Sequence, residues 1–171
     1  MKNLTASIRG FTLIELMVVI GIIGILSSIA FVGFDGAREK SRDEKRVVDI
    51  AQIELALRLY VEQNGHYPLE ADGFSGGTLG RICESCTGPI NAALQTYLGS
   101  VPSDPLDTGN YYYYYDGNQS CGGNPTQAVV SARTMETDRY KNTADTICSS
   151  WGGEGGIGGT DSYNTVLGDG G

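Results

Sequence analysis

The sequence predicts an α+β protein in which a long N-terminal α-helix, membrane-spanning in its first half, packs on a small antiparallel β-sheet head. Three observations predict this fold: an uncharged apolar run at residues 16–34, an apolar stripe at helical spacing through residues 47–61, and aromatic and β-branched segments between turn residues after residue 100. The length of 171 residues allows roughly one globular domain with an appendage.

The apolar run at residues 16–34 contains no charge and only two serines. As a helix with about 1.5 Å rise per residue it would be about 28 Å long, close to the roughly 30 Å hydrocarbon core of a bilayer. The run is longer than the apolar region of a cleaved secretory signal, which usually has about 7 to 15 residues. It therefore predicts a membrane span, and a buried core helix is the alternative.

The same helix is predicted to continue beyond the apolar run. Apolar side chains recur at spacings of three and four residues, which define one face of a helix, at Val47, Ile50, Ile53, Leu57, Tyr60 and Val61. Asn64 and Gly65, with Pro68 shortly after, form a C-terminal stop. We expect one helix over residues 12–64, with two helices broken near Gly33 or Gly36 as the alternative.

Residues 65–150 are predicted to form the globular head. Five consecutive tyrosines at 111–115 lie between turn residues and predict a strand, and residues 128–134 predict a second one. Residues 90–98 predict a short helix, and the glycine-rich residues 151–171 a tail or loop. We expect a sheet of three or four strands, with about half of the tyrosine rings covering the long helix and half facing solvent or a neighbour.

The charge distribution excludes several classes of function. The chain has 12 basic and 20 acidic residues and a net charge of -8, which argues against a nucleic-acid-binding module. A single histidine cannot build a multi-histidine metal centre, and the sequence contains no GxSxG, HExxH or P-loop pattern. We therefore expect no enzyme activity; a membrane-tethered hydrolase is the remote alternative.

The residues GFTLIE at positions 10–15 stand immediately before the apolar run. Glu15 places an ionisable group at the edge of an apolar segment, which is costly and points to a function. This segment resembles the class III signal of type IV pilins and type II secretion pseudopilins. The resemblance implies that a prepilin peptidase cleaves between Gly10 and Phe11, N-methylates Phe11 and leaves the apolar anchor in place. It also implies that Glu15 pairs with the N-terminal amine of a neighbouring subunit during assembly.

Two later segments strengthen the resemblance: NGHYP at residues 64–68 and YLGSVPSDP at residues 97–105 are similar to segments in pseudopilin heads. The resemblance implies a pilin-like fold with a prepilin leader at 1–10, a transmembrane assembly helix at 11–34 and its amphipathic continuation at 35–64. The implied function is a structural filament subunit, closest to the major pseudopilin of a type II protein secretion system. An adhesive or motility type IV pilin is the alternative.

The resemblance also implies a location and a set of partners. The precursor would cross the inner membrane once with its head outside the cytoplasm, and the filament would stand in the periplasm or on the cell surface. The partners would be prepilin peptidase, identical or related pilin subunits and an inner-membrane assembly platform, with no nucleic acid. Two basic residues precede the span and five follow it closely, which favours the opposite orientation by the positive-inside rule.

Four cysteines, Cys83, Cys86, Cys121 and Cys148, all follow the predicted span. An even number in a translocated domain predicts disulfides, and four cysteines allow three pairings. We favour Cys83 with Cys86 and Cys121 with Cys148, because the second bond would close a long loop worth about 3 kcal/mol. A zinc site of four thiolates and a redox-active CxxC are the alternatives.

The C-terminal region raises the question of calcium. In the major pseudopilins that this chain resembles, an acidic, glycine-rich C-terminal loop holds a calcium ion. Glu154, Asp161, Ser162 and Asp169 offer the oxygen ligands that calcium needs. Because their spacing matches no fixed loop, we predict no cofactor and keep calcium as an alternative.

Overall fold

The computed structural model describes residues 10–69, 74, 80–117, 128–141 and 161–168, with the side chains of 29–33 left out. The chain forms two compact units, Met1–Arg38 and Glu39–Gly171, and each is described by itself. One helix, α1 (Leu13–Asn64), contributes residues to both units. This confirms a single long helix rather than two helices broken near Gly33 or Gly36.

The helix α1 ends where the sequence predicts. Gly65 has a φ of 78°, in the left-handed region that glycine adopts without steric cost. Its N–H donates to the carbonyl of Val61 at 2.7 Å, and the side-chain amide of Asn64 donates to the carbonyl of Tyr60 at 2.9 Å. The first of these bonds satisfies the carbonyl of Val61, one of the last four of the helix, which have no partner within it.

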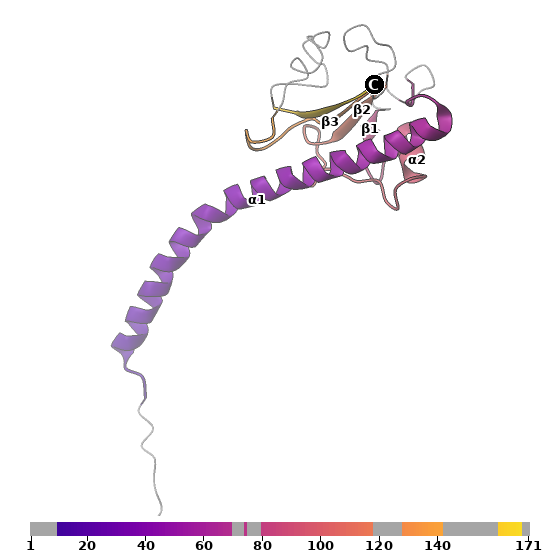
Figure 1. Ribbon diagram of the computed structural model, residues 1–171. Coiled ribbons are helices and arrows are strands. Elements are labelled where there is room, and N and C mark those ends of the chain that lie inside the picture. Colours follow the sequence, from indigo (N-terminus) through magenta and orange to yellow (C-terminus); the bar gives the residue numbers. More distant parts are fainter. Residues whose placement is uncertain (1–9, 70–73, 75–79, 118–127, 142–160, 169–171) are drawn as a thin grey trace, which may run out of the picture. The chain divides into compact units, whose positions relative to one another are not determined.

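The head unit, Glu39–Gly171, contains a four-stranded sheet (Figure 1). The strands are β1 (Arg81–Ile82), β2 (Tyr113–Asp116), β3 (Ala128–Ala132) and β4 (Tyr163–Leu167). Their order in the sheet is β1-β2-β3-β4, and each pairs antiparallel with the next. The predicted α+β class, with an antiparallel sheet of four strands, is confirmed.

The expectation that about half of the tyrosine rings face solvent or a neighbour is wrong for the strand, whereas Tyr111 and Tyr112, which precede it, are partly exposed. The strand covers only the second part of the tyrosine run, and Tyr113, Tyr114 and Tyr115 are all buried. Tyr113 and Tyr115 lie in the core, whereas Tyr114 projects from the opposite face of the strand. There its ring packs so close to Gly80 that a Cβ on Gly80 would lie 2.8 Å from the ring.

Part of the predicted C-terminal tail belongs to the sheet. Within residues 151–171, Tyr163–Leu167 forms β4, which pairs with β3 along all five of its residues, from Ala128↔Leu167 to Ala132↔Tyr163. Leu167 is fully buried. The glycines on either side made the segment look like a flexible tail, but the YNTVL stretch has enough β-branched and aromatic residues for a strand.

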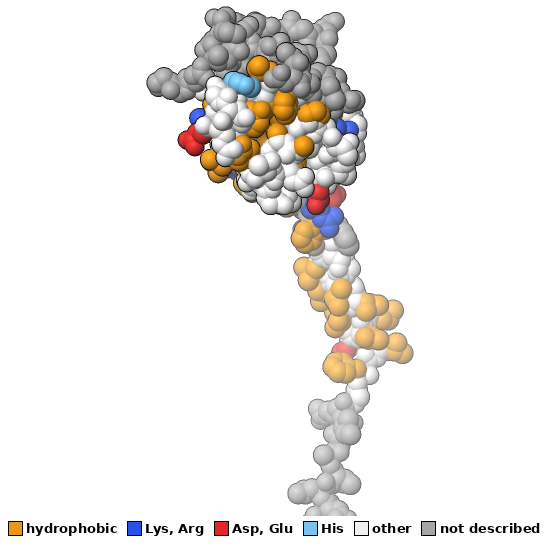
Figure 2. Space-filling model, turned by 90° about the vertical axis from the view of Figure 1, so that its right-hand side faces the viewer, with side chains coloured by type: hydrophobic (Ala, Val, Ile, Leu, Met, Phe, Trp, Pro, Cys, Tyr) orange, Lys and Arg blue, Asp and Glu red, His pale blue; other side chains and the backbone are white. Residues whose placement is uncertain are grey.

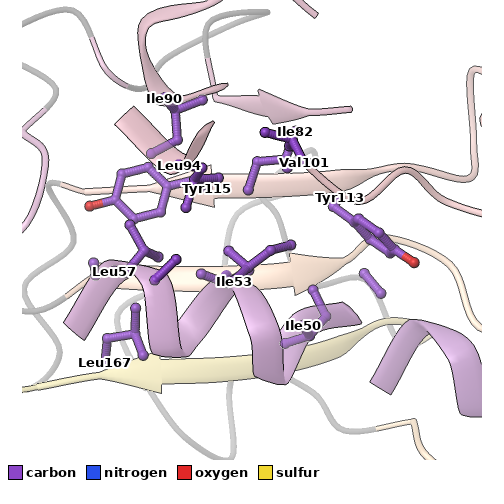
Figure 3. Close-up of a cluster of buried hydrophobic side chains, with 14 of the residues drawn as sticks. Ile50, Ile53, Leu57, Ile82, Ile90, Leu94, Val101, Tyr113, Tyr115 and Leu167 are labelled. Atoms are coloured by element: carbon purple, nitrogen blue, oxygen red, sulfur yellow. The ribbon is translucent and has the colours of Figure 1, made fainter. Parts of the chain in front are cut away.

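The core lies between the sheet and the second half of α1 (Figure 3). Ile50, Ile53 and Leu57 project from α1 toward the side chains of the sheet. The short helix α2 (Pro89–Gln95) adds Ile90 and Leu94. Full burial of such a side chain is worth about 1.5–3 kcal/mol relative to leaving it exposed, so this contact holds α1 on the head.

Candidate functional site

In the N-terminal segment, the predicted processing residue Phe11 and the predicted assembly residue Glu15 lie close together. Gly10 and Phe11 precede the helix, and 90% of Phe11 is exposed. Phe11, Glu15 and three aliphatic residues of the first turns line one hollow of about 330 Å³. Figure 2 shows hydrophobic side chains gathered over the first part of α1, and the large exposed ones are Leu13, Ile14, Leu16, Met17, Val18, Val19, Ile20, Ile22, Ile23, Ile25 and Leu26.

Glu15 forms a capping box with Thr12, which the sequence analysis missed. The Glu15 carboxylate accepts hydrogen bonds from the Thr12 N–H at 2.8 Å and the Thr12 hydroxyl at 2.7 Å, and the Glu15 N–H donates to Thr12 Oγ1 at 3.3 Å. The pattern Thr-x-x-Glu before an apolar run is the known sequence signature of this motif. The carboxylate is therefore held at the N-terminal end of α1, four residues from Phe11.

The residues that the structure describes contain no helix that is both long and apolar enough to cross a membrane. The predicted span at residues 16–34 therefore stays a prediction.

In the head, Arg46 is fully buried and binds three carboxylates. Its guanidinium donates to both oxygens of Asp104 at 2.7 and 3.0 Å. It also donates to Asp43 and to Glu136, each at 2.7 Å. Arg42 forms a two-point ion pair with the same Glu136. We call these five residues the ionic cluster.

The ionic cluster joins three distant segments of the chain. Asp43 accepts hydrogen bonds from the N–H groups of Glu136 and Thr137 at 3.0 and 2.7 Å, and from the Thr137 hydroxyl at 2.7 Å. Asp104, which lies within the PSDP segment, also accepts the Leu106 N–H at 2.9 Å. The cluster therefore fixes α1 to the loop before β2 and to the segment that follows β3.

Acidification is expected to unfold the head through the ionic cluster. The Arg42 guanidinium holds the pKa of Glu136 below its ordinary value of 4.5. Burial acts to raise the pKa of Asp43, but hydrogen bonds from Glu136, Thr137 and Arg46 outweigh it and lower that pKa below 3.8. In the unfolded chain these carboxylates have their ordinary pKa values, so they take up protons at a higher pH than in the folded chain. The stability that they contribute is therefore fully present above the ordinary values and is lost as the pH falls through the lower values of the folded chain.

This acid sensitivity can be measured as the denaturation midpoint of the full chain in detergent between about pH 7 and about pH 3. The midpoint of the wild-type chain should fall steeply below about pH 4.5, whereas Glu136→Gln should start lower at neutral pH and fall less. Identical pH profiles for the two chains would contradict a role for Glu136.

The first cysteine pair forms a disulfide. Cys83 and Cys86 are bonded with their Cα atoms 5.1 Å apart, the pairing favoured by the sequence analysis. With both sulfurs in a disulfide, neither is a thiolate available to zinc. The side chain of Asn91 holds the backbone beside this disulfide. It accepts a hydrogen bond from the Cys83 N–H at 3.0 Å and donates one to the Arg81 carbonyl at 2.7 Å. Cys121 and Cys148 lie outside the described residues.

The described residues alone do not make a calcium site. Of the candidate ligands, Glu154 and Asp169 lie outside the described part of the chain. The Asp161 carboxylate is paired with the ammonium of Lys141 at 2.9 Å, and Ser162 accepts a hydrogen bond from Asn164 at 2.8 Å. Within the described ranges, no three acidic, histidine or cysteine side chains gather where a metal ion could be held. Calcium binding stays the alternative to the prediction of no cofactor.

An exposed apolar helix start, a long helix on a small antiparallel sheet and a Glu at the helix N-terminus together define a pilin-like protein. Two family models match the chain in succession: the prokaryotic N-terminal methylation motif at residues 6–31 and type II secretion system protein G at residues 34–128. The chain belongs to the type II secretion system protein G family.

Several relatives carry the name type II secretion system core protein G. The Escherichia coli K12 protein is 41% identical over 107 residues, which cover 61% of this chain and 69% of that protein. The Dickeya chrysanthemi protein is 37% identical over 97 residues, which cover 57% of this chain and 62% of that protein. The Pectobacterium carotovorum protein is 36% identical over 100 residues, which cover 58% of this chain and 63% of that protein. The matches to the last two span under two thirds of their lengths. No solved structure matches the chain.

Proposed function

We propose that the mature chain is a structural subunit of a filament in a type II protein secretion system, assembled through its N-terminal helix. The observation that carries this proposal is the methylation motif joined directly to the protein G region. The exposed apolar side chains of α1 support it, because large apolar surfaces in water favour association. Packing of residues 11–34 between subunits would then supply the energy of assembly.

The proposed route begins with a precursor that is anchored in the inner membrane by residues 16–34, with its head outside the cytoplasm. Prepilin peptidase removes residues 1–10 and methylates Phe11, and an assembly platform inserts the subunit among identical or related ones. In an apolar surrounding, a lone carboxylate and a lone ammonium are both costly, and pairing them relieves both costs. Glu15 is thus proposed to pair with the N-terminal amine of a neighbour and to set the axial register.

The mature N-terminus tests this proposal directly. Mass spectrometry of the chain from its own host should show N-methylated Phe11 as the first residue. Gly10→Val should leave the precursor at full length, whereas Gly99→Ala should be processed normally. A mature N-terminus at another residue, or processing of Gly10→Val, would contradict the proposed cleavage.

Glu15→Val is expected to leave cleavage intact and to abolish filament assembly, measured as pelletable filament per processed subunit. Thr12→Val is the matched control, because it removes the capping hydroxyl at 2.7 Å from Glu15 and keeps the carboxylate. Pairing with a neighbour's amine predicts that Thr12→Val still assembles. If Thr12→Val fails as completely as Glu15→Val, the carboxylate acts as a helix cap and the pairing proposal is wrong.

A deletion strain distinguishes the secretion role from a surface pilus. Loss of protein secretion with surface filaments unchanged under the electron microscope is the expected result. Secretion at the wild-type level, with loss of surface filaments, would support an adhesive or motility pilin instead.

A further inference from the structure

Arg133 is a cation without an acidic partner in an acidic part of the chain. Beyond Glu62 the chain carries four basic and twelve acidic residues. The other three bases pair with carboxylates: Arg81 with Asp107, Arg139 with Glu44, and Lys141 with Asp138 and Asp161. The Arg133 side chain forms no ion pair and no hydrogen bond with any residue that the structure describes. With acidic residues in such excess, an unpaired guanidinium is unexpected.

The register of the sheet places Arg133 and Arg81 on either side of β2, on the same face. The Arg133 N–H donates to the carbonyl of Tyr112 at 3.0 Å, which continues the pairing of β2 with β3 by one residue. Arg81 of β1 lies opposite Tyr114. Residues two apart in a strand, and the residues opposite them, project from one face. All four side chains therefore lie on the face of the sheet that is turned away from the core.

Both guanidinium groups lie against the ring of Tyr112. The guanidinium carbon of Arg81 is 5.0 Å from the ring centre and that of Arg133 is 5.4 Å from it. Cation–π attraction restrains both flexible side chains, so two positive charges are held within 5.4 Å of one point. Like charges held near each other repel, and a bound anion removes this repulsion. We call Arg81, Tyr112 and Arg133 the arginine clasp.

The arginine clasp has hydrogen-bond donors that are open to a ligand. Arg81 donates through Nη2 to Asp107 at 2.8 Å, and 33% of its side chain is exposed. Arg81 Nη1 and the three side-chain nitrogens of Arg133 bond to no described residue, and none of these four atoms is buried. The planar N–H edge of a guanidinium matches the two oxygens of a carboxylate.

The charge of the head favours one kind of anion. A membrane surface or a nucleic acid presents many negative charges over a wide area, which would meet the acidic remainder of the head together with the arginine clasp. A second copy of the chain would bring the same excess of acidic residues. A short acidic segment of a different protein reaches the clasp alone, and its neighbouring carboxylates can engage both guanidinium groups.

We propose that the arginine clasp binds an acidic segment of a different protein. Carboxylates of the segment accept hydrogen bonds from Arg133 and from Arg81 Nη1, and the Tyr112 ring holds both cations in place. The site lies on the head and uses none of residues 11–34. It therefore gives the head a contact with another protein that is independent of how subunits of this chain assemble.

NMR spectroscopy of the full chain in a neutral detergent tests this site. The Nε–H signal of Arg133, assigned by its loss in Arg133→Gln, should shift on titration with a hexaglutamate peptide with blocked ends. A hexaglutamine peptide of the same length should leave it in place. No shift with hexaglutamate would overturn the proposal. A shift on raising the concentration of the chain alone would make a second copy the ligand and would overturn it too.

Arg139→Gln is the matched control for Arg133→Gln. It removes the same charge from the same segment, and Arg139 also stacks on a tyrosine, 5.2 Å from the ring centre of Tyr140. Followed through the Arg81 signal, Arg133→Gln should weaken hexaglutamate binding by about tenfold or more, as expected for charge-assisted hydrogen bonds, and Arg139→Gln by less than about twofold. Equal effects would show that the peptide responds to net charge alone, which would overturn the site.

Substitutions of Tyr112 test the ring. Tyr112→Leu should weaken hexaglutamate binding by about two- to fivefold, because it removes the cation–π contacts, whereas Tyr112→Phe keeps them and should bind like the wild type. Both variants should melt at the wild-type temperature. Equal binding by the two variants would overturn the role of the ring.

Lipid bicelles that contain phosphatidylglycerol test the other class of ligand. The Arg133 signal of the full chain should have the same position in these bicelles as in neutral ones. A shift with the anionic bicelles and none with hexaglutamate would make a lipid headgroup the ligand and overturn the proposal.

Discussion

Replacing Arg46 with methionine is expected to destabilise the folded head by about 3–5 kcal/mol, because it removes the partner of buried charges. Arg46 and Asp43 have fully buried side chains, and those of Asp104 and Glu136 are only 1% and 9% exposed. Methionine fills a similar volume, so the loss reports the uncompensated carboxylates rather than a cavity. Chemical denaturation of the full chain in detergent, followed by near-ultraviolet circular dichroism of the tyrosines, measures this loss.

Arg58→Met is the matched control for this prediction. Arg58 pairs with Glu54 on the surface of the same helix, where the two side chains are 51% and 25% exposed. Exposed pairs at this spacing contribute less than about 1 kcal/mol. If the two variants lose the same stability, the ionic cluster is not what holds the head together.

Gly117→Ala is expected to cost about 3 kcal/mol or more, near the upper end for overpacking of a tight site. A Cβ at residue 117 would lie 1.9 Å from the carbonyl oxygen of Pro68 and 2.8 Å from the hydroxyl oxygen of Tyr115. The same Pro68 carbonyl accepts the hydrogen bond of the buried Tyr115 hydroxyl at 2.7 Å. The methyl group must therefore push apart the segment after α1 and the strand β2, lowering the denaturation midpoint.

Gly99→Ala provides the comparison, because nothing lies within 4 Å of its added Cβ. This substitution should change the free energy of unfolding by less than about 0.5 kcal/mol, as is usual for surface positions. A Gly117→Ala chain as stable as Gly99→Ala would show that Pro68 moves away at little cost.

The sequence predicted the features whose causes are local. The course of α1 follows from a stripe with spacings of three and four residues, and its end from the pair Asn64 and Gly65. The strand at β3 follows from a run of small and β-branched residues between turn segments. In each case one stretch of chain contains the whole physical reason, so periodicity and turn chemistry were enough.

The features that the sequence analysis missed depend on contacts between distant residues. Arg46 meets Asp104 across 58 positions, and Arg42 meets Glu136 across 94. The sequence contains one sign of the ionic cluster. Arg46 lies four residues before Ile50, on the buried face of the helix, where the apolar stripe would require an apolar side chain. The strand β1 has two residues, too few for any alternation to show. The Thr12 capping box was visible as Thr-x-x-Glu and was overlooked.

The ionic cluster has a mechanical consequence for a subunit that is held by its helix. A pull along the second half of α1 loads the bonds of Arg46 and Asp43 in shear, together with the apolar contacts of Ile50, Ile53 and Leu57. Sliding α1 by one turn, about 5.4 Å, would break the bonds of the cluster that join α1 to the rest of the head, namely those from Arg46 to Asp104, from Arg42 and Arg46 to Glu136, and from the Glu136 and Thr137 N–H groups to Asp43. A force applied to the second half of α1 is therefore transmitted to the sheet through these bonds and through the apolar core.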